Sequence, residues 1–141
     1  MNQTINPSGW PRPSGYANAI LAQGRYLAMS GQIGWNERNE LVGNDFLAQA
    51  RQALENVMTI LRAAGGAGEH LVRLTWYITD KAEYRQTLRA LGDAYREIVG
   101  PHYPAMALVQ VAALLEEGAK VEIEATAVLP AAPAQEPARS L

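Results

Sequence analysis

A chain of 141 residues is long enough for one domain with a single hydrophobic core, but not for two such domains. Its 48% hydrophobic and 18% charged residues are typical of an ordinary globular protein, and a formal net charge of −2 gives no electrostatic footprint for nucleic acid or an anionic membrane. The sequence contains no cysteine, which excludes disulfides, thiolate nucleophiles and cysteine-ligated metals. No signal-peptide pattern and no run near ~20 apolar residues occurs, so we expect a cytoplasmic protein.

The two ends of the chain are expected to lie outside the folded domain. Residues 1–15 hold three prolines and two glycines and are predicted to form an irregular arm. Trp10 in that arm is either pinned to the body or to a neighbouring subunit, or is an ordinary packing aromatic. Residues 130–141 are rich in proline and alanine without periodicity and are expected to be disordered. The domain itself then covers residues 16–129.

Two short apolar runs open the domain, at residues 17–22 and 25–30. A Gln-Gly pair between them favours a hairpin turn, so the runs are predicted to be two paired strands. The second run ends in Gly31, where the missing side chain either permits a ligand to approach the backbone or simply relieves the strand end. The polar, turn-like segment that follows contains Trp35.

The first helix is predicted to begin at an Asn44 or Asp45 cap and to run to Ala64, where two glycines stop it. Its apolar residues recur at helical spacing and form one buried stripe. The stripe consists of Leu47, Ala50, Leu54, Val57, Met58 and Leu61. The polar residues expected to be mostly solvated are Gln49, Arg51, Gln52 and Glu55.

Alternating apolar and polar residues over 73–79 predict a strand with one core face. Asp80 is expected to cap a second helix, with Glu83 completing a capping box, and Gly100-Pro101 ends that helix. Its predicted inner stripe consists of Tyr84, Leu88, Leu91, Tyr95 and Ile98.

Two further strands are predicted within residues 103–113 and 121–128, because branched apolar residues recur there at every second position. In the first of them, the face that holds Met106 and Leu108 is mostly apolar.

The last strand carries Glu122 and Glu124 on the face opposite its apolar residues. A strand face with two carboxylates must turn to water, to a cleft or to a partner subunit. The residues alone slightly favour a solvated face.

The predicted order of elements is β-β-α-β-α-β-β. This order indicates a single-domain α+β fold, a mixed β-sheet with two helices packed on one face. The other face of the sheet then lacks cover within the chain, and a homo-oligomer would supply it.

Most familiar catalytic constellations are missing from the sequence. Only His70 and His102 are present, in different contexts, so a histidine-based metal site would need unusual partners. There is no Gly-x-Ser-x-Gly elbow, and the glycine-rich stretch at 65–68 follows a helix and lacks the Lys-Ser/Thr ending of a phosphate loop. The remaining candidates are Tyr16, Gly31, Glu122 and Glu124.

Three segments carry a resemblance to a known family. Residues 30–33 are Ser-Gly-Gln-Ile, residues 49–56 are Gln-Ala-Arg-Gln-Ala-Leu-Glu-Asn, and residues 122–125 are Glu-Ile-Glu-Ala after an alternating valine strand. Together they resemble the signature of the Rid family, the reactive intermediate deaminases also called YjgF-like proteins, over roughly residues 13–128. The resemblance implies a chorismate-mutase-like Rid fold and a homotrimer around a central barrel, with clefts between neighbouring subunits.

By the same resemblance, an inter-subunit cleft would bind a small imine or enamine next to Tyr16, Gly31, Met106 and Glu122. Glu122 would position the water that hydrolyses the C=N bond to a carbonyl and ammonia, and neither a metal nor another cofactor is implied. A protonated imine is already electrophilic, so a carboxylate that orients water and shuttles a proton suffices.

Two departures from the family pattern concern the substrate. Met106 stands where the family has an arginine that would pair with a substrate carboxylate, and Gly92 stands where it has an asparagine. Met106 beside Leu108 forms an adaptable apolar wall, to which Trp35 and Trp10 would add flat surface. We therefore expect a ligand that is bulkier, less anionic at that position, or anchored elsewhere.

Three functions follow as hypotheses. The first is hydrolytic deamination of a reactive imine or enamine, on a larger or less carboxylate-dependent substrate than typical family members take, for instance in catabolism of an amino-aromatic compound. The second is a non-catalytic trimer that binds small apolar ligands or proteins in its clefts. The third, ribonuclease activity or translation inhibition, is a label attached to some relatives, and the acidic balance argues against it. The expected partners are a small-molecule substrate and further copies of the chain, with no nucleic acid and no membrane.

Overall fold

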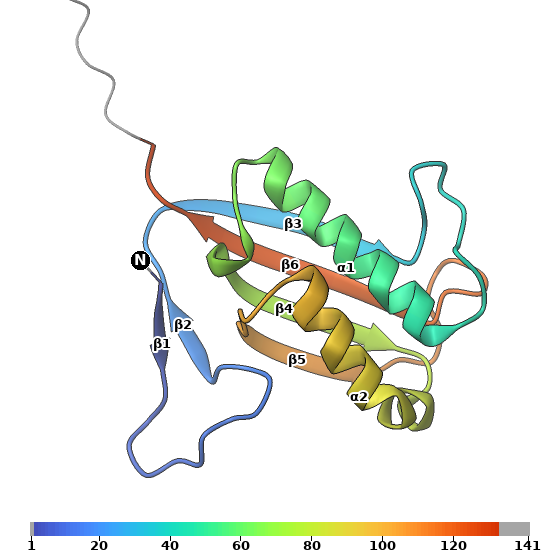
Figure 1. The fold of residues 1–141 in the computed structure, drawn as a ribbon, viewed down its shortest axis with the longest axis horizontal. Coiled ribbons are helices and arrows are strands. Elements are labelled where there is room, and N and C mark those ends of the chain that lie inside the picture. Colours follow the sequence, from blue (N-terminus) through green and yellow to red (C-terminus); the bar gives the residue numbers. More distant parts are fainter. Residues whose placement is uncertain (1, 133–141) are drawn as a thin grey trace, which may run out of the picture.

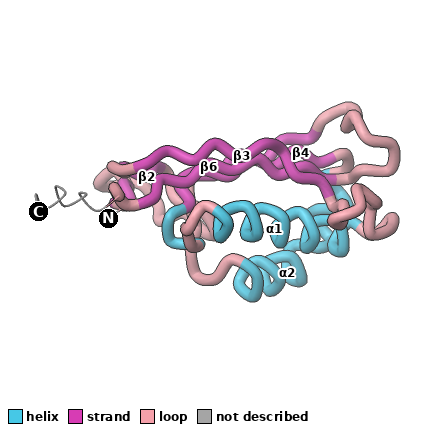
Figure 2. Tube along the Cα trace, turned by 90° about the horizontal axis from the view of Figure 1, so that it is seen from above, coloured by secondary structure: helices cyan, strands magenta, loops and turns pink. Residues whose placement is uncertain are grey.

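The computed structural model describes residues 2–132 and has two layers, a β-sheet and a pair of helices that cover one of its faces (Figures 1 and 2). The predicted single-domain α+β fold with a mixed sheet is confirmed. In chain order the elements are β1 (Gln3–Ile5), β2 (Ala19–Leu21), β3 (Arg25–Ile33), α1 (Phe46–Ala63), the short 3-10 helix η1 (Gly68–His70), β4 (Leu71–Ile78), α2 (Lys81–Ile98), β5 (Ala105–Gln110) and β6 (Val121–Leu129).

The main sheet has four strands in the order β3-β6-β4-β5, which places β5 at one edge (Figure 1). Strands β4 and β5 are parallel and are connected through α2, whereas β6 is antiparallel to both β3 and β4. Parallel neighbours need a crossover of this kind, because a tight turn cannot return the chain to the same end of the sheet.

The hydrophobic core lies between the sheet and α1, with α2 packed alongside. The predicted alternation holds in β4 and β6, where every second side chain is buried against the helices. The largest fully buried apolar side chains are Leu54, Val57, Leu61, Leu74, Ile78, Val121 and Ile123. Side chains on the opposite face of the sheet, which no helix within residues 2–132 covers, are half-buried or exposed (Figure 2).

The strand pairing near the N-terminus differs from the prediction. Strand β2 does not form a hairpin with β3; it pairs antiparallel with β1, so the two make a separate two-stranded sheet. The N-terminal arm is therefore not irregular throughout, since Gln3–Ile5 is a strand. The composition of a three-residue strand says little about its partner, because pairing is decided by contacts far along the chain.

Gln49 is another correction, because this residue was expected to be solvated and is instead fully buried. Its Nε2 donates hydrogen bonds to the Gly43 and Gly118 carbonyl oxygens at 2.7 and 2.9 Å, and its Oε1 accepts one from the Lys120 backbone N–H at 2.8 Å. Each polar atom of the amide is satisfied by backbone, which is the condition for burying such a group. Gln49 thus holds together the loop before α1 and the loop that leads into β6.

Both helices begin as predicted, with Asp45 and Asp80 as their N-caps. The Asp80 carboxylate accepts from the Ala82 and Glu83 backbone N–H groups. The Glu83 side chain does not close the predicted capping box; it accepts from Lys120 Nζ at 3.0 and 3.2 Å.

The inner stripe of α2 is not covered along its whole length. Leu88 is 50% exposed, although its helical position places it with the buried Leu91 and Tyr95. Helix α2 lies over the edge of the sheet, and the sheet ends at β5 beneath it (Figure 1). An apolar side chain at that border is left facing an open space.

Trp10 is 61% exposed and does not join the core of its own chain. The predicted disordered tail lies largely outside the described residues. None of the helices within residues 2–132 is both long and apolar enough to cross a lipid bilayer.

Candidate functional site

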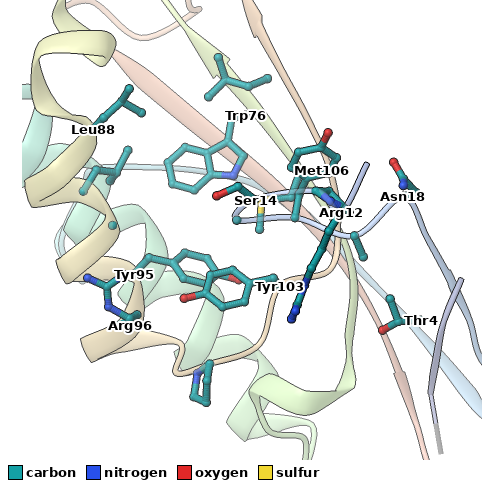
Figure 3. A pocket seen from close by; sticks show the side chains of 18 of the residues that line it. Thr4, Arg12, Ser14, Asn18, Trp76, Leu88, Tyr95, Arg96, Tyr103 and Met106 are labelled. Atoms are coloured by element: carbon teal, nitrogen blue, oxygen red, sulfur yellow. The ribbon is translucent and has the colours of Figure 1, made fainter. Parts of the chain in front are cut away.

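A groove of about 1220 Å³ lies between the N-terminal arm, helix α2 and the edge strand β5 (Figure 3). It is the space that Leu88 faces. The residues that give it its chemical character are Tyr16, Trp76, Leu88, Tyr103, Met106 and Leu108.

The arm is joined to the edge strand by a short parallel bridge. The Ala17 N–H donates to the Pro104 carbonyl oxygen at 3.0 Å, and Ala17 pairs with Ala105. This pairing places the neighbouring Tyr16, which is 44% exposed, beside Met106. Tyr16 also borders a smaller hollow of about 220 Å³ on the outer side of the same edge, together with Arg73.

The apolar wall of the groove comes from two adjacent parallel strands. Met106 lies opposite Leu74, and Leu108 lies opposite Trp76, so these side chains point to the helix-covered face. Trp76 is only 5% exposed, whereas Met106 and Leu108 are half-buried. The predicted apolar wall of Met106 and Leu108 is therefore present, and Trp76 rather than Trp35 or Trp10 extends it.

The far end of the groove is held by a pair of stacked tyrosine rings, Tyr95 and Tyr103, whose centroids are 5.3 Å apart. The Tyr95 hydroxyl donates to the His102 carbonyl oxygen. Burial, with a smaller contribution from Tyr103, raises the pKa of the Tyr95 phenol, so Tyr95 remains a neutral donor. Both rings thus serve as fixed walls.

Gly31 and Glu122 lie together on the other face of the sheet. A Cβ atom placed on Gly31 would come within 2.6 Å of the Glu122 carboxylate, so a larger residue at this position would push that side chain out of its present place. The register of β3 and β6 shifts between Met29 and Gln32, and such bulges redirect side chains beside functional sites. The glycine therefore serves the close approach of a carboxylate to the strand backbone.

Glu124 shares the open sheet face with Glu122 but has a different neighbour. Its carboxylate accepts a hydrogen bond from the Tyr77 hydroxyl at 3.2 Å. The negative charge of Glu124 raises the pKa of Tyr77, with smaller contributions from burial and from Glu122. The two glutamates are thus chemically distinguishable, because one is engaged by a phenol and the other lies over a glycine.

The structure brings the predicted site residues together in two groups. Tyr16, Met106 and Leu108 line the groove on the helix side, whereas Gly31 and Glu122 lie on the open face of the sheet. Strand β4 separates Met106 on β5 from Glu122 on β6. A single chain therefore does not unite all of these residues in one cleft.

Trp35 belongs to neither group. It follows β3, bridges to Leu41, and its carbonyl oxygen accepts a hydrogen bond from Asn56 Nδ2 at 2.9 Å. Its backbone thus has a structural role in fixing the loop before α1.

Arg12 lines the groove and was missed by sequence reasoning. The signal was available, because Arg12 is the only charged residue in positions 1–24. Nothing in the sequence, however, placed the arm against α2. Across the described part of the chain, no three His, Asp or Glu side chains gather closely enough to hold a metal ion.

Comparison with known proteins gives consistent matches over most of the chain. The family model described as endoribonuclease L-PSP matches residues 11–129. A protein from Capra hircus named 2-iminobutanoate/2-iminopropanoate deaminase is 37% identical, over 80% of this chain and 79% of that protein. Together these matches cover the groove as well as the open face of the sheet.

Two solved structures show the same architecture. YyfB of the Rid protein family from Yersinia pestis has a TM-score of 0.80 and 35% identity, over 91% of this chain and 98% of that one. The YjgF gene product from Escherichia coli has a TM-score of 0.66 and 34% identity, over 89% and 98% of the two chains.

Proposed function

Since this chain belongs to the Rid (YjgF-like) family, which the endoribonuclease L-PSP model describes, we propose that it hydrolyses a reactive imine or enamine to a carbonyl compound and ammonia. The observation that carries the proposal is the placement of the Glu122 carboxylate over the bare backbone of Gly31. A relative named 2-iminobutanoate/2-iminopropanoate deaminase supports the type of reaction.

In the proposed reaction, Glu122 acts on water. The carboxylate orients a water molecule and accepts its proton while the water oxygen attacks the imine carbon. The C=N electron pair moves to nitrogen, which yields a carbinolamine. Glu122 then returns the proton to nitrogen, the C–N bond breaks, and ammonia leaves. As the C=O bond forms, Glu122 accepts the carbinolamine hydroxyl proton and passes it to the departing ammonia, so that the carboxylate is regenerated and ammonium is released. Since the carbon of a protonated imine is already electrophilic, positioning and one proton shuttle are sufficient.

The proposed active form is a homotrimer. Glu122 and Met106 point to opposite faces of the sheet within one chain, so a neighbouring subunit is needed to complete a cleft that contains both. The open face of the sheet has no cover from the described part of the chain, which also supports association. The groove of one subunit and the Glu122 side of its neighbour would then form each cleft.

The proposed substrate is larger than those of typical family members, or less dependent on a carboxylate at position 106. Met106 offers no charge, and a small anionic imine would meet apolar surface there. The extent of the groove toward Leu88 and Trp76 supports a bulkier ligand.

The decisive test is ammonia release from imines generated in place from leucine by an amino-acid oxidase. Glu122→Gln should keep the assembly and its melting temperature but lower imine hydrolysis roughly 100-fold or more, which is the scale of general-base loss. Glu124→Gln is the matched control, since this carboxylate is engaged by Tyr77, and it should retain most of the activity.

Equal losses from the two variants would favour a general electrostatic effect over a specific base. If the wild-type protein releases no ammonia beyond the uncatalysed rate, the alternative is a non-catalytic trimer that binds small molecules or proteins. The endoribonuclease label of the family model does not direct the proposal toward RNA, because acidic residues outnumber basic ones by 14 to 12.

A further inference from the structure

We propose that Arg12 of the N-terminal arm binds a carboxylate of the ligand, so that the groove accepts imines of amino acids with large apolar side chains. This inference rests on the proposed function and specifies its substrate class. The positive charge that Met106 lacks would be supplied by Arg12, which lines the same groove but belongs to the N-terminal arm.

The charges of the groove support an anionic ligand. Two charged residues line it, Arg12 and Arg96, and no Asp or Glu among the described residues does so. The chain as a whole carries more acidic than basic residues. The charged side chains that line the groove are thus opposite in sign to the net charge of the chain, which favours an anionic ligand there.

The two arginines are not equivalent. Arg96 donates to the Asp93 carboxylate on the same helix, so its charge is compensated. Arg12 has no carboxylate partner within residues 2–132 and makes no side-chain hydrogen bond there. Figure 3 shows its side chain running along the arm side of the groove next to Met106. A free guanidinium offers the planar pair of donors that a carboxylate accepts.

The opposite side of the groove is apolar. Trp76, Leu88 and Leu108 line this side. Leu88 is exposed there because no other described segment packs against it. Figure 3 shows Leu88 and Trp76 on the side of α2, across from Arg12. Pockets that combine an apolar wall with a few placed polar groups are typical of small-molecule sites.

A ligand that uses both sides must be amphipathic. Its carboxylate would lie at Arg12, and its side chain would cover Trp76 and Leu88. A side chain of one or two carbons would leave that wall exposed to water, which is unfavourable in proportion to the apolar area. The geometry thus favours imines derived from phenylalanine or leucine over those derived from alanine.

The test compares two imines that share a phenyl group and differ in the carboxylate. One is made from phenylalanine by an amino-acid oxidase and the other from 2-phenylethylamine by an amine oxidase, and ammonia release is measured for both. Arg12→Gln should raise KM for the first by about 10- to 100-fold, the scale of one charge-assisted contact, and should leave the second unchanged. Arg12→Lys should recover part of the loss, because it restores the charge but not the planar fork.

Arg89→Gln is the matched control, because Arg89 is an exposed residue of α2 that does not line the groove. It removes the same net charge and should change neither substrate. The inference would be overturned if Arg12→Gln affected both imines equally or neither of them. It would also be overturned if Arg73→Gln, at the neighbouring hollow, produced the carboxylate-specific loss instead.

A binding experiment separates this inference from the proposed function. Phenylpyruvate, the carbonyl product of the phenylalanine imine, is titrated into the protein by calorimetry. Arg12→Gln should weaken its binding about 10-fold or more even if no imine is hydrolysed, in which case the site stands and the enzymatic proposal fails. If the wild type hydrolyses imines but Arg12→Gln binds phenylpyruvate as tightly as the wild type does, the proposed enzymatic function stands and the role of Arg12 is overturned.

Discussion

At the scale of single residues, we propose that position 106 decides which small substrates the protein accepts. An arginine there would place a charge on the floor of the groove between Leu74 and the arm, whereas Met106 presents a polarizable apolar side chain. An arginine–carboxylate pair in a desolvated site contributes a few kcal/mol, so its absence should cost about 10- to 1000-fold with small 2-imino acids.

Met106→Arg should therefore recover part of the activity on the alanine-derived imine, measured as ammonia release beside the wild type. Recovery is expected to be incomplete, because Gly92, where the family resemblance implies an asparagine, presents no side chain to the groove. There is room for such a side chain, since the nearest atom to a Cβ at Gly92 is Arg96 Nη1 at 3.9 Å. Gly92→Asn combined with Met106→Arg should recover more.

The result that would contradict this reading is a wild-type protein already as efficient on the alanine-derived imine as the Capra hircus deaminase. Met106 would then not determine specificity. The fold and the position of Glu122 would be unaffected by that result.

Single-residue chemistry was the part of the site that the sequence predicted best. Alternation predicted the apolar face of Met106 and Leu108, and the family resemblance implied that Gly31, Glu122 and Met106 share one cleft. The structure places Gly31 beside Glu122, but on the opposite face of the sheet from Met106. Arg12 was not predictable, because it acts through an arm whose position depends on contacts with β5.

At the scale of elements, Gln49 is the clearest case of tertiary context overriding local pattern. One side chain on α1 satisfies three backbone groups in two loops that are distant in sequence. Helical periodicity assigned it to the polar face, but the loop into β6 lies over that face and buries it. A periodic pattern describes one helix, and it contains no information about loops that pack on it later.

Gln49→Ala should lower the free energy of unfolding by roughly 2–4 kcal/mol, because it leaves buried backbone groups without partners and opens a cavity. The measurement is chemical denaturation at matched protein concentration, since an oligomer gains stability by mass action. Gln86→Ala on the exposed side of α2 is the control and should stay within about 0.5 kcal/mol.

A loss below about 0.5 kcal/mol in Gln49→Ala would mean that water replaces the three hydrogen bonds without cost. The two loops would then be held by other contacts. Lys120, whose backbone N–H donates to Gln49, lies two residues before Glu122. If Gln49→Ala breaks this hydrogen bond and loosens the loop, it should also reduce imine hydrolysis at temperatures below the unfolding transition.

The predicted pairing of β2 with β3 failed at the same scale and for a related reason. Both runs are apolar and a Gln-Gly turn separates them, yet β2 finds its partner in β1. The hairpin prediction used only neighbouring residues, whereas β3 has β6 beside it along its whole length. That pairing occupies only one edge of β3, and β2 pairs with β1 rather than with the other edge, a choice that the neighbouring residues alone do not reveal.

At the scale of the whole molecule, the uncovered sheet face is the strongest reason to expect association. Tyr26 and Val109 are exposed there, beside the half-buried Thr75 and Glu122. Light scattering at micromolar concentration should give three times the 15.3 kDa mass of the chain. A monomer under those conditions would remove both the interface and the proposed cleft.

The parallel bridge between Ala17 and Ala105 influences the affinity of the groove for a ligand, because it holds the N-terminal arm against β5. Tyr16 and Arg12 belong to a segment whose only regular strands form their own small sheet, so this segment is a natural unit for local opening while the core stays folded. The observed affinity then equals the intrinsic affinity multiplied by the fraction of molecules in which the arm is docked. Changes that weaken the backbone contact of Ala17 with Pro104 would therefore lower the observed affinity through that fraction.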